Sequence, residues 1–230
     1  MDRRRPRHRW ALDDEPDPDP AWAAAQKKTL IATERDEVAR AAWRAELAEV
    51  DPETVVFLDE TSTQTVMTRT RGRAPRGARV IGAVPRNRGP NITCLVALGA
   101  TGTLAPCVFE GAVTSDLFVR WLQEWLVPTL VPGTTVVLDN LAVHRHAAVR
   151  SAIEEADCAL RYLPPYSPDF NPIELAFSKL KTHLRGAAAR SYETVLTAIG
   201  TGLDRITPAD IRGYYAHCGF PLPEPDGQPI

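Results

Sequence analysis

Short apolar runs bounded by turn residues are the clearest pattern in the sequence. Several of them are nearly continuous and rich in β-branched residues, which is typical of strands buried on both faces of a sheet. The candidate strands are 54–60, 78–84, 91–99, 103–109, 134–139 and 159–163. Because the strands after 54–60 follow one another closely, with a Gly-containing turn at 99–102, we predict an antiparallel meander for this half of the sheet.

In the segments before, between and after these strands, apolar residues recur at helical spacing. The candidate helices are 33–50, 114–128, 146–156, 171–185, 192–206 and one that starts at 207. A helix at 146–156 between two strands forms a βαβ unit, so the strands at 134–139 and 159–163 should be parallel. Large apolar side chains recur at helical spacing in 114–128, and we interpret them as core: Phe118, Trp121, Leu122 and Trp125. The pattern therefore predicts an α/β fold.

The segment before Glu174 predicts a stiff entry into a helix. Prolines in 164–168 oppose helix and ladder pairing, Asn171 is a favourable N-cap, and Pro172 suits the first helical position. Glu174 then falls at the third helical position, where its carboxylate can complete a capping box with Asn171. This structural role is one interpretation of Glu174, and a role in chemistry is the other.

Two further carboxylates stand at the ends of predicted buried strands. Asp59 ends the run at 54–59, and Asp139 ends the run at 134–139. A charge in such a place is costly unless it is paired or holds a metal ion, and open α/β sheets place their sites at the carboxyl ends of strands. Glu60 should point to the opposite face from Asp59, so we interpret it as structural. We interpret Asp169 as a turn residue.

The length and composition of the chain limit the classes of protein to which it can belong. A chain of 230 residues with 44% hydrophobic content can bury one full core, which favours a single domain with a tail. The net charge of −2 does not indicate nucleic-acid binding, but a local basic stripe matters more than the sum. Four scattered cysteines argue against structural zinc and a disulfide framework. Since no apolar run reaches 18 residues and no signal peptide is recognisable, we expect a cytoplasmic protein with no membrane partner.

The two ends of the chain differ in composition from the rest. A basic block at 3–9 precedes an acidic, proline-rich block at 13–20, and both have very little to bury. Such composition predicts a disordered tail over 1–26. The last residues, 221–230, are rich in proline and are expected to form a loose C-terminal tail. The folded domain should therefore span 27–220.

A stretch rich in arginine follows the first predicted strand. Five arginines fall within eleven positions, with glycine and proline between them: Arg69, Arg71, Arg73, Arg76 and Arg79. The planar guanidinium can bond two phosphate oxygens, and glycine lets the backbone come close. We predict a loop that clamps the DNA backbone, although a solvated loop is the alternative. Lys181 and Arg185 lie on the same helical stripe as Glu174 and are further candidates for phosphate contact.

Taken together, these motifs resemble the catalytic domain of the IS630/Tc1/mariner transposase superfamily, the DDE-type endonucleases, and most closely its bacterial IS630 branch. The matching stretches are Phe57-Leu58-Asp59-Glu60-Thr61, Arg71-Gly72-Arg73-Ala74-Pro75-Arg76-Gly77, Leu138-Asp139-Asn140 with His144, Leu163-Pro164-Pro165-Tyr166-Ser167-Pro168-Asp169, and Asn171-Pro172-Ile173-Glu174. Between Asp139 and Glu174 lie 34 residues, positions 140 to 173, which is the spacing for which this family is named. The resemblance covers roughly residues 27–220.

This resemblance implies a fold and a reaction. The fold would be RNase H-like, with a mixed five-stranded sheet, an antiparallel meander plus parallel strands, flanked by helices. Asp59, Asp139 and Glu174 would be catalytic and would hold two Mg²⁺ or Mn²⁺ ions, with Asp59 bridging both. Asn140 and His144, near the second carboxylate, would contact the scissile phosphate or support the metal ligands, and a plain hydrogen-bonding role is the alternative for His144. The reaction would be DNA strand cleavage and strand transfer in cut-and-paste transposition, into targets that contain TA.

The resemblance also implies partners and leaves alternatives open. Transposon ends and a target duplex would be bound by a homodimer or a higher assembly, in the bacterial cytoplasm and on the nucleoid. The family's usual N-terminal helix-turn-helix domain has no counterpart in this sequence. A frameshift half with a separately encoded helix-turn-helix partner, a truncated copy and a non-catalytic DNA-binding remnant are therefore alternatives. A general RNase H-like nuclease fits the metal site but not the arginine-rich stretch or the Pro-Pro-Tyr-Ser-Pro motif.

Overall fold

The computed structural model describes residues 31–224. The chain divides into two compact units, Met1–Thr33 and Glu34–Ile230, and every described helix and strand lies in the second. The predicted disordered tail at 1–26 lies outside the described residues. Of the predicted C-terminal tail, only 221–224 are described, and they form neither helix nor strand. No helix within the described part is both long enough and apolar enough to cross a membrane.

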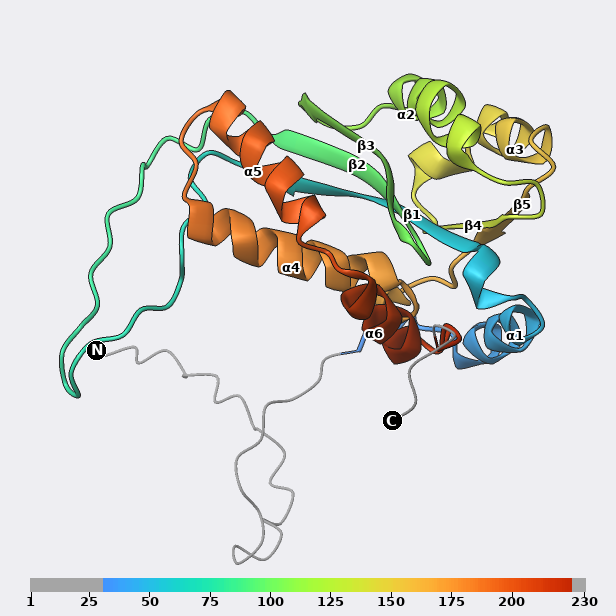
Figure 1. Ribbon diagram of the computed structural model, residues 1–230, viewed down its shortest axis with the longest axis horizontal. Coiled ribbons are helices and arrows are strands. Elements are labelled where there is room, and N and C mark those ends of the chain that lie inside the picture. Colours follow the sequence, from blue (N-terminus) through green and yellow to red (C-terminus); the bar gives the residue numbers. More distant parts are fainter. Residues whose placement is uncertain (1–30, 225–230) are drawn as a thin grey trace, which may run out of the picture. The chain divides into compact units, whose positions relative to one another are not determined.

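A mixed five-stranded sheet is the core of the second unit (Figure 1). Its strands are β1 (Val55–Thr63), β2 (Ile92–Gly99), β3 (Gly102–Glu110), β4 (Thr135–Leu138) and β5 (Ala159–Tyr162). They lie in the order β3-β2-β1-β4-β5. The pairs β1–β2 and β2–β3 are antiparallel, whereas β1–β4 and β4–β5 are parallel. The predicted meander and the predicted parallel βαβ unit are both confirmed.

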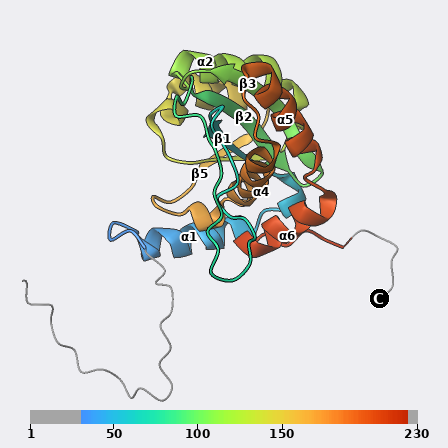
Figure 2. The same ribbon diagram turned by 90° about the vertical axis from the view of Figure 1, so that its left-hand side faces the viewer.

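Helices pack on both faces of this sheet (Figure 1 and Figure 2). They are α1 (Glu37–Ala48), α2 (Ser115–Trp121), α3 (Ala147–Glu154), α4 (Pro172–Ala187), α5 (Tyr192–Asp204) and α6 (Pro208–Cys218). Phe57 of β1 belongs to the core shared with α1, α4, α5 and α6, and the next residue, Leu58, belongs to the core shared with α2 and α3. Both side chains are fully buried. Burial on two faces explains why the strand sequences are continuously apolar.

The predicted strand at 78–84 is absent. Residues 64–91 form one long connection between β1 and β2, in which no strand is assigned. The apolar side chains within 78–84 are exposed, Ile81 by 88%. A strand needs a partner edge, and both edges of β2 are already taken by β1 and β3. Residues 78–84 also pair with neither outer edge of the sheet, at β3 and β5, so this sequence pattern forms no strand.

The helix predicted at 114–128 changes its pitch halfway. Regular α2 ends at Trp121, and a wider π-turn at Leu122–Leu126 follows it, then a 3₁₀ turn at Val127–Thr129. The wider turn shifts the later residues around the helix axis. Leu126 is consequently buried while Trp125 is 51% exposed, so the prediction that Trp125 is core was wrong.

Asp169 is more than a turn residue. It lies in a 3₁₀ turn just before α4 and accepts hydrogen bonds from Arg40 of α1, Nη1 to Oδ1 at 3.0 Å and Nη2 to Oδ2 at 2.6 Å. The Arg40 side chain is 1% exposed, and its guanidinium lies 3.9 Å from the ring centre of Phe170. Trp43 of α1 stacks on the same ring. Helix α1 thus holds the turn that leads into α4.

Candidate active site

The three carboxylates singled out from the sequence line one cleft of about 430 Å³. Asp59 lies on β1, Asp139 directly follows β4, and Glu174 lies in the first turn of α4. Because β1 and β4 are parallel neighbours, their carboxyl-terminal parts lie toward the same edge of the sheet. The segment 163–168 forms most of the remaining wall.

Asp59 is the most buried of the three carboxylates, with 8% of its surface exposed. Its Oδ1 accepts a hydrogen bond from the backbone N–H of Glu60 at 2.8 Å, and its Oδ2 accepts one from Nδ2 of Asn171 at 3.1 Å. Burial, together with the negative charges of Asp139 and Glu174, raises the pKa of Asp59 to about 8. This carboxylate therefore favours a bound proton or a nearby cation.

Asn171 serves this site and not the helix cap that its position suggests. It occupies the N-cap position of α4, but its side chain makes no capping hydrogen bond. The capping-box interpretation of Glu174 was wrong, since that box needs the Asn171 side chain. The amide of Asn171 instead holds Asp59, which is 112 positions away in sequence. Its Oδ1 is buried and has no hydrogen-bond partner among the described residues.

Asp139 is held by a buried histidine. Nδ1 of His144 lies 2.5 Å from Oδ1 of Asp139, and Nε2 lies 3.2 Å from Oε2 of Glu60. Burial opposes a charge on His144, but the two carboxylates outweigh it and raise the pKa of His144 to about 9. Burial alone would raise the pKa of Asp139, yet the hydrogen bonds from His144 and from the backbone of Leu141 lower it. His144 therefore favours its protonated, positively charged form, which lies between the carboxylates of Asp139 and Glu60.

Asn140 joins two walls of the cleft. Its Nδ2 donates a hydrogen bond to the backbone carbonyl of Leu163, which ties the loop after β4 to the end of β5.

Tyr166 lies in the Pro-Pro-Tyr-Ser-Pro motif, lines the cleft and is 57% exposed. Its φ of 55° is a left-handed conformation, which is strained for a tyrosine. In the sequence this motif contributed only to the family resemblance, and Tyr166 itself was not predicted as a site residue.

The donor atoms around the cleft fit a hard divalent cation. Three carboxylates and the unpartnered Oδ1 of Asn171 are the oxygen ligands that Mg²⁺ or Mn²⁺ prefers. Within residues 31–224, no three side chains of His, Cys, Asp or Glu lie close enough together to ligate one ion.

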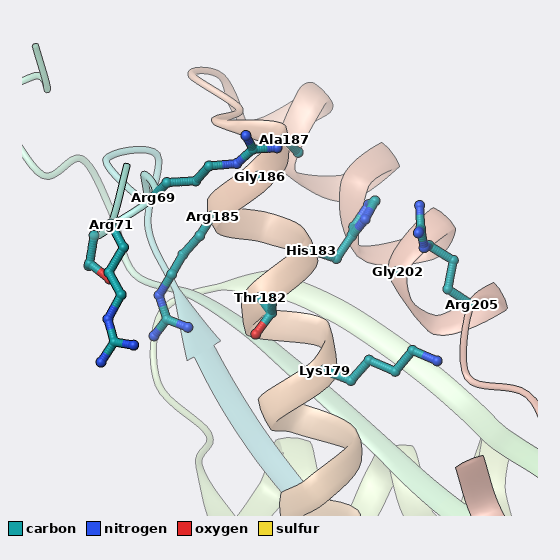
Figure 3. A pocket seen from close by; sticks show the side chains of 11 residues that line it. Arg69, Arg71, Lys179, Thr182, His183, Arg185, Gly186, Ala187, Gly202 and Arg205 are labelled. Carbon is teal, nitrogen blue, oxygen red and sulfur yellow. The ribbon is translucent and has the colours of Figure 1, made fainter. Parts of the chain in front are cut away.

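The predicted DNA-contacting residues fall into two groups. Arg69, Arg71 and Arg185 line a second groove, of about 900 Å³, which crosses α4 beside α5 (Figure 3). The other four do not line it: Arg73, Arg76, Arg79 and Lys181. The first three of these are exposed along the 64–91 connection.

Three further basic side chains line this groove: Lys179, His183 and Arg205. None of the three was among the DNA-contacting residues predicted from the sequence. Arg205 comes from the end of α5, 20 positions beyond Arg185. A periodicity within one helix could not have placed it here.

The chain is similar to known proteins both in sequence and in fold. Residues 54–196 match the DDE superfamily endonuclease family. No curated protein matches the chain in sequence. Among solved structures, a pre-cleavage Mos1 transpososome superposes with a TM-score of 0.63 at 15% identity, over 86% of this chain and 64% of that chain. The Mos1 mariner paired end complex with Mn gives 0.65 at 18% identity, over 86% and 64%.

The catalytic domain of Mos1 mariner transposase, solved alone, gives a TM-score of 0.57 at 13% identity, over 79% of this chain and 85% of that chain. At such identities the likeness shows the fold, which is the RNase H-like fold of transposase catalytic domains. The chain spans less than two thirds of the length of the first two structures. The family match covers more than half of the sequence and includes Asp59, Asp139 and Glu174, so the chain belongs to the DDE superfamily endonucleases.

Proposed function

We propose that this chain is the catalytic domain of a DDE transposase, which cuts DNA strands and transfers the freed 3′ ends to a target duplex. The observation that carries the proposal is that Asp59, Asp139 and Glu174 line one cleft of a DDE endonuclease fold. Assignment to the bacterial IS630 branch rests on the Pro-Pro-Tyr-Ser-Pro motif and on the 34 residues between Asp139 and Glu174. The preference for TA targets follows from that assignment alone.

Asp59, Asp139 and Glu174 would hold two divalent cations, Mg²⁺ or Mn²⁺. When bound, these ions activate the attacking water or 3′-OH, stabilise charge at phosphorus and neutralise the leaving oxygen. The Mos1 mariner paired end complex has been solved with Mn and with Mg, which supports this choice of metals. The hard oxygen donors around the cleft support it independently.

The protein's own groups prepare the three carboxylates for this task. Asn171 holds one oxygen of Asp59, and the backbone of Glu60 holds the other. His144 fixes the orientation of Asp139. Glu174 stands on the rigid first turn of α4, whose preceding turn is held by α1. Orientation by such surrounding contacts is what metal sites require of their ligands.

DNA is the proposed partner, both as transposon ends and as target duplex. The similar Mos1 structures are a transpososome, a strand transfer complex and paired end complexes, which supports a homodimer or a higher assembly on DNA. The chain is proposed to act in the bacterial cytoplasm on nucleoid DNA.

The test is nicking of supercoiled plasmid and of labelled duplex by the purified chain in Mg²⁺, in Mn²⁺ and in EDTA. We expect cleavage with either metal and none in EDTA. Asp59→Asn, Asp139→Asn and Glu174→Gln should each abolish it while the protein stays folded. Glu155→Gln, an exposed change just after α3, serves as the matched control and should cleave normally. A folded wild-type chain that binds DNA but never cleaves it would favour the non-catalytic remnant.

A further inference from the structure

The groove across α4, here called the basic groove, collects cations from three parts of the chain (Figure 3). Arg69 and Arg71 come from the connection between β1 and β2, Lys179 and Arg185 from α4, and Arg205 from the end of α5. Figure 3 shows Arg71 and Arg185 on one flank of the α4 ribbon and Lys179 and Arg205 on the other. The basic surface therefore spans the exposed face of the helix.

The charge of the basic groove is unbalanced within the described residues. Five cations line it and no carboxylate does, although the whole chain has a net charge of −2. Lys179 has an ion pair, with Asp210 at 2.5 Å, but no ion pair is found for the four arginines in the described part of the chain. A hollow lined by one sign of charge concentrates ions of the opposite sign. A polyanion is thus the ligand that this surface fits.

The wall formed by the connection is anchored to the rest of the fold. Nη1 of Arg190, just beyond α4, donates hydrogen bonds to the backbone carbonyls of Thr65 at 3.0 Å and Met67 at 2.8 Å. Nη2 of Arg69 lies 3.5 Å from the place where a Cβ on Gly186 would be. The guanidinium of Arg69 therefore lies against the end of α4, at a distance that would still leave room for a Cβ on residue 186. The arginines of the connection are therefore brought to α4 by specific contacts.

Helix α4 also sets the distance from the basic groove to the active site. Glu174 is in its first turn and Arg185 is eleven residues later. At 1.5 Å of rise per residue, the two are about 16 Å apart along the axis. Duplex DNA advances 3.4 Å per base pair, so this distance corresponds to about five base pairs.

We propose that the basic groove binds the sugar-phosphate backbone of duplex DNA within about five base pairs of the scissile bond, without reading its sequence. The proposal rests on the proposed function, because it places the scissile phosphate at Glu174. It adds Lys179 and Arg205 to the DNA-contacting residues. It also separates Arg69 and Arg71, which lie in the groove, from the exposed arginines further along the connection.

The first test measures the affinity for a labelled duplex by fluorescence anisotropy over a range of salt concentrations. Arg69→Gln and Arg205→Gln should each weaken binding several-fold. Each should also lower the slope of log affinity against log salt by about 0.9, as expected for one lost phosphate contact. Arg150→Gln, an exposed arginine of α3, is the matched control and should leave the slope unchanged. Unchanged slopes in both groove variants would overturn the proposal.

The second test locates the contacts. Single neutral methylphosphonates are placed along the duplex, and the loss of affinity is mapped against the nicking position. We expect sensitive positions within about five base pairs of the nick for the wild type. We expect this sensitivity to weaken in Arg205→Gln. Sensitivity confined to distant phosphates would overturn the proposal. The proposal would also be overturned if Arg69→Gln and Arg205→Gln weakened the binding of inorganic phosphate or pyrophosphate but left the affinity for DNA unchanged.

The outcomes separate this proposal from the proposed function. Suppose that the wild type binds DNA, that the groove variants lower the slope of log affinity against log salt, and that no nicking occurs. The result would then support the phosphate-binding groove and contradict the proposed catalytic function. If the wild type nicks DNA while Arg69→Gln and Arg205→Gln bind with wild-type slopes, the proposed function stands and the groove falls.

Discussion

His144 connects Asp139 to Glu60 through its two ring nitrogens, at 2.5 Å and 3.2 Å. The ring is completely buried, packs 4.5 Å from the ring of Phe118 and has its backbone carbonyl held by the hydroxyl of Tyr162 at 2.9 Å. A rotation of the histidine is therefore blocked on several sides. Because Glu60 fixes the far side of the ring, it sets the direction in which Asp139 points, although it does not line the three-carboxylate cleft.

We expect Glu60→Gln to weaken metal use by Asp139. Loss of the charge that supports His144 should raise the Mg²⁺ concentration needed for half-maximal nicking by about tenfold or more, as for other partners of metal ligands. Glu60→Asp should recover part of the loss. Nicking rates against Mg²⁺ concentration and direct Mn²⁺ binding measure the effect. If Glu60→Gln is folded and has wild-type metal dependence, Glu60 does not position Asp139.

Substitutions of Asn171 separate a helix cap from support of Asp59. Serine is an equally good N-cap residue but is too short to replace the amide that reaches Oδ2 of Asp59. We therefore expect Asn171→Ser to abolish nicking, with a loss of stability of about 1–3 kcal/mol from the unsupported carboxylate. Nicking assays and urea unfolding provide the two readouts. Full activity in Asn171→Ser would show that the bond to Asp59 is dispensable.

Tyr166 exposes its ring at the cleft, where DNA bases next to the cut would lie. We expect Tyr166→Ala to reduce DNA affinity and nicking by an amount that corresponds to about 1–3 kcal/mol of base stacking. Tyr166→Phe keeps the ring and should stay near wild type. Tyr166→Gly relieves the left-handed backbone strain, so it should lose activity without losing stability. Equal activity in the alanine and phenylalanine variants would contradict stacking.

The pair of Arg40 and Asp169 should matter for stability. Asp169→Ala would leave the buried guanidinium of Arg40 with only Glu37, 3.4 Å from its Nε, as an ionic partner, at a cost of about 3 kcal/mol in the free energy of unfolding. Asp116→Ala, an exposed change in the first turn of α2, should cost less than about 1 kcal/mol. Urea denaturation measures both variants. A cost for Asp169→Ala no larger than that of the control would mean that α1 is held by its aromatic contacts alone.

We expect the ionisation of Asp210 to make the stability of the fold depend on pH. The hydrogen bond from Lys179, followed by those from Thr207, lowers the pKa of Asp210 to about 2. When folding lowers the pKa of a carboxylate, the ionised group stabilises the folded state. This stabilisation is complete at pH values above the ordinary pKa of 3.8, and it is lost as the pH falls through the folded-state pKa of about 2. Because the pair is partly exposed, we expect Asp210→Asn to cost about 1 kcal/mol at pH 6. The difference between wild type and variant should shrink below pH 3.8 and vanish only below pH 2, as measured by urea unfolding, and a constant difference would contradict this.

Local patterns were enough to predict the elements that carry the cleft. The apolar runs that end at Asp59 and Asp139 became β1 and β4, and Asn171-Pro172 became the start of α4. These predictions succeeded because burial on both sheet faces and the geometry of a helix start leave marks within a few residues. The strand predicted at 78–84 did not form because a strand needs a paired neighbour, and which segments pair is a property of the whole sheet and not of the local sequence.

The sequence by itself determined the order of the strands and helices along the chain and the three carboxylates that the cleft contains, because each depends on neighbours in sequence. Only the tertiary structure decided which side chains serve those carboxylates and which cations share a groove. Asn171 meets Asp59, His144 meets Glu60, and Arg205 lies in the groove with Arg69, all across long separations in sequence. Such contacts arise from the packing of distant elements, which leaves no periodic pattern in the amino-acid sequence.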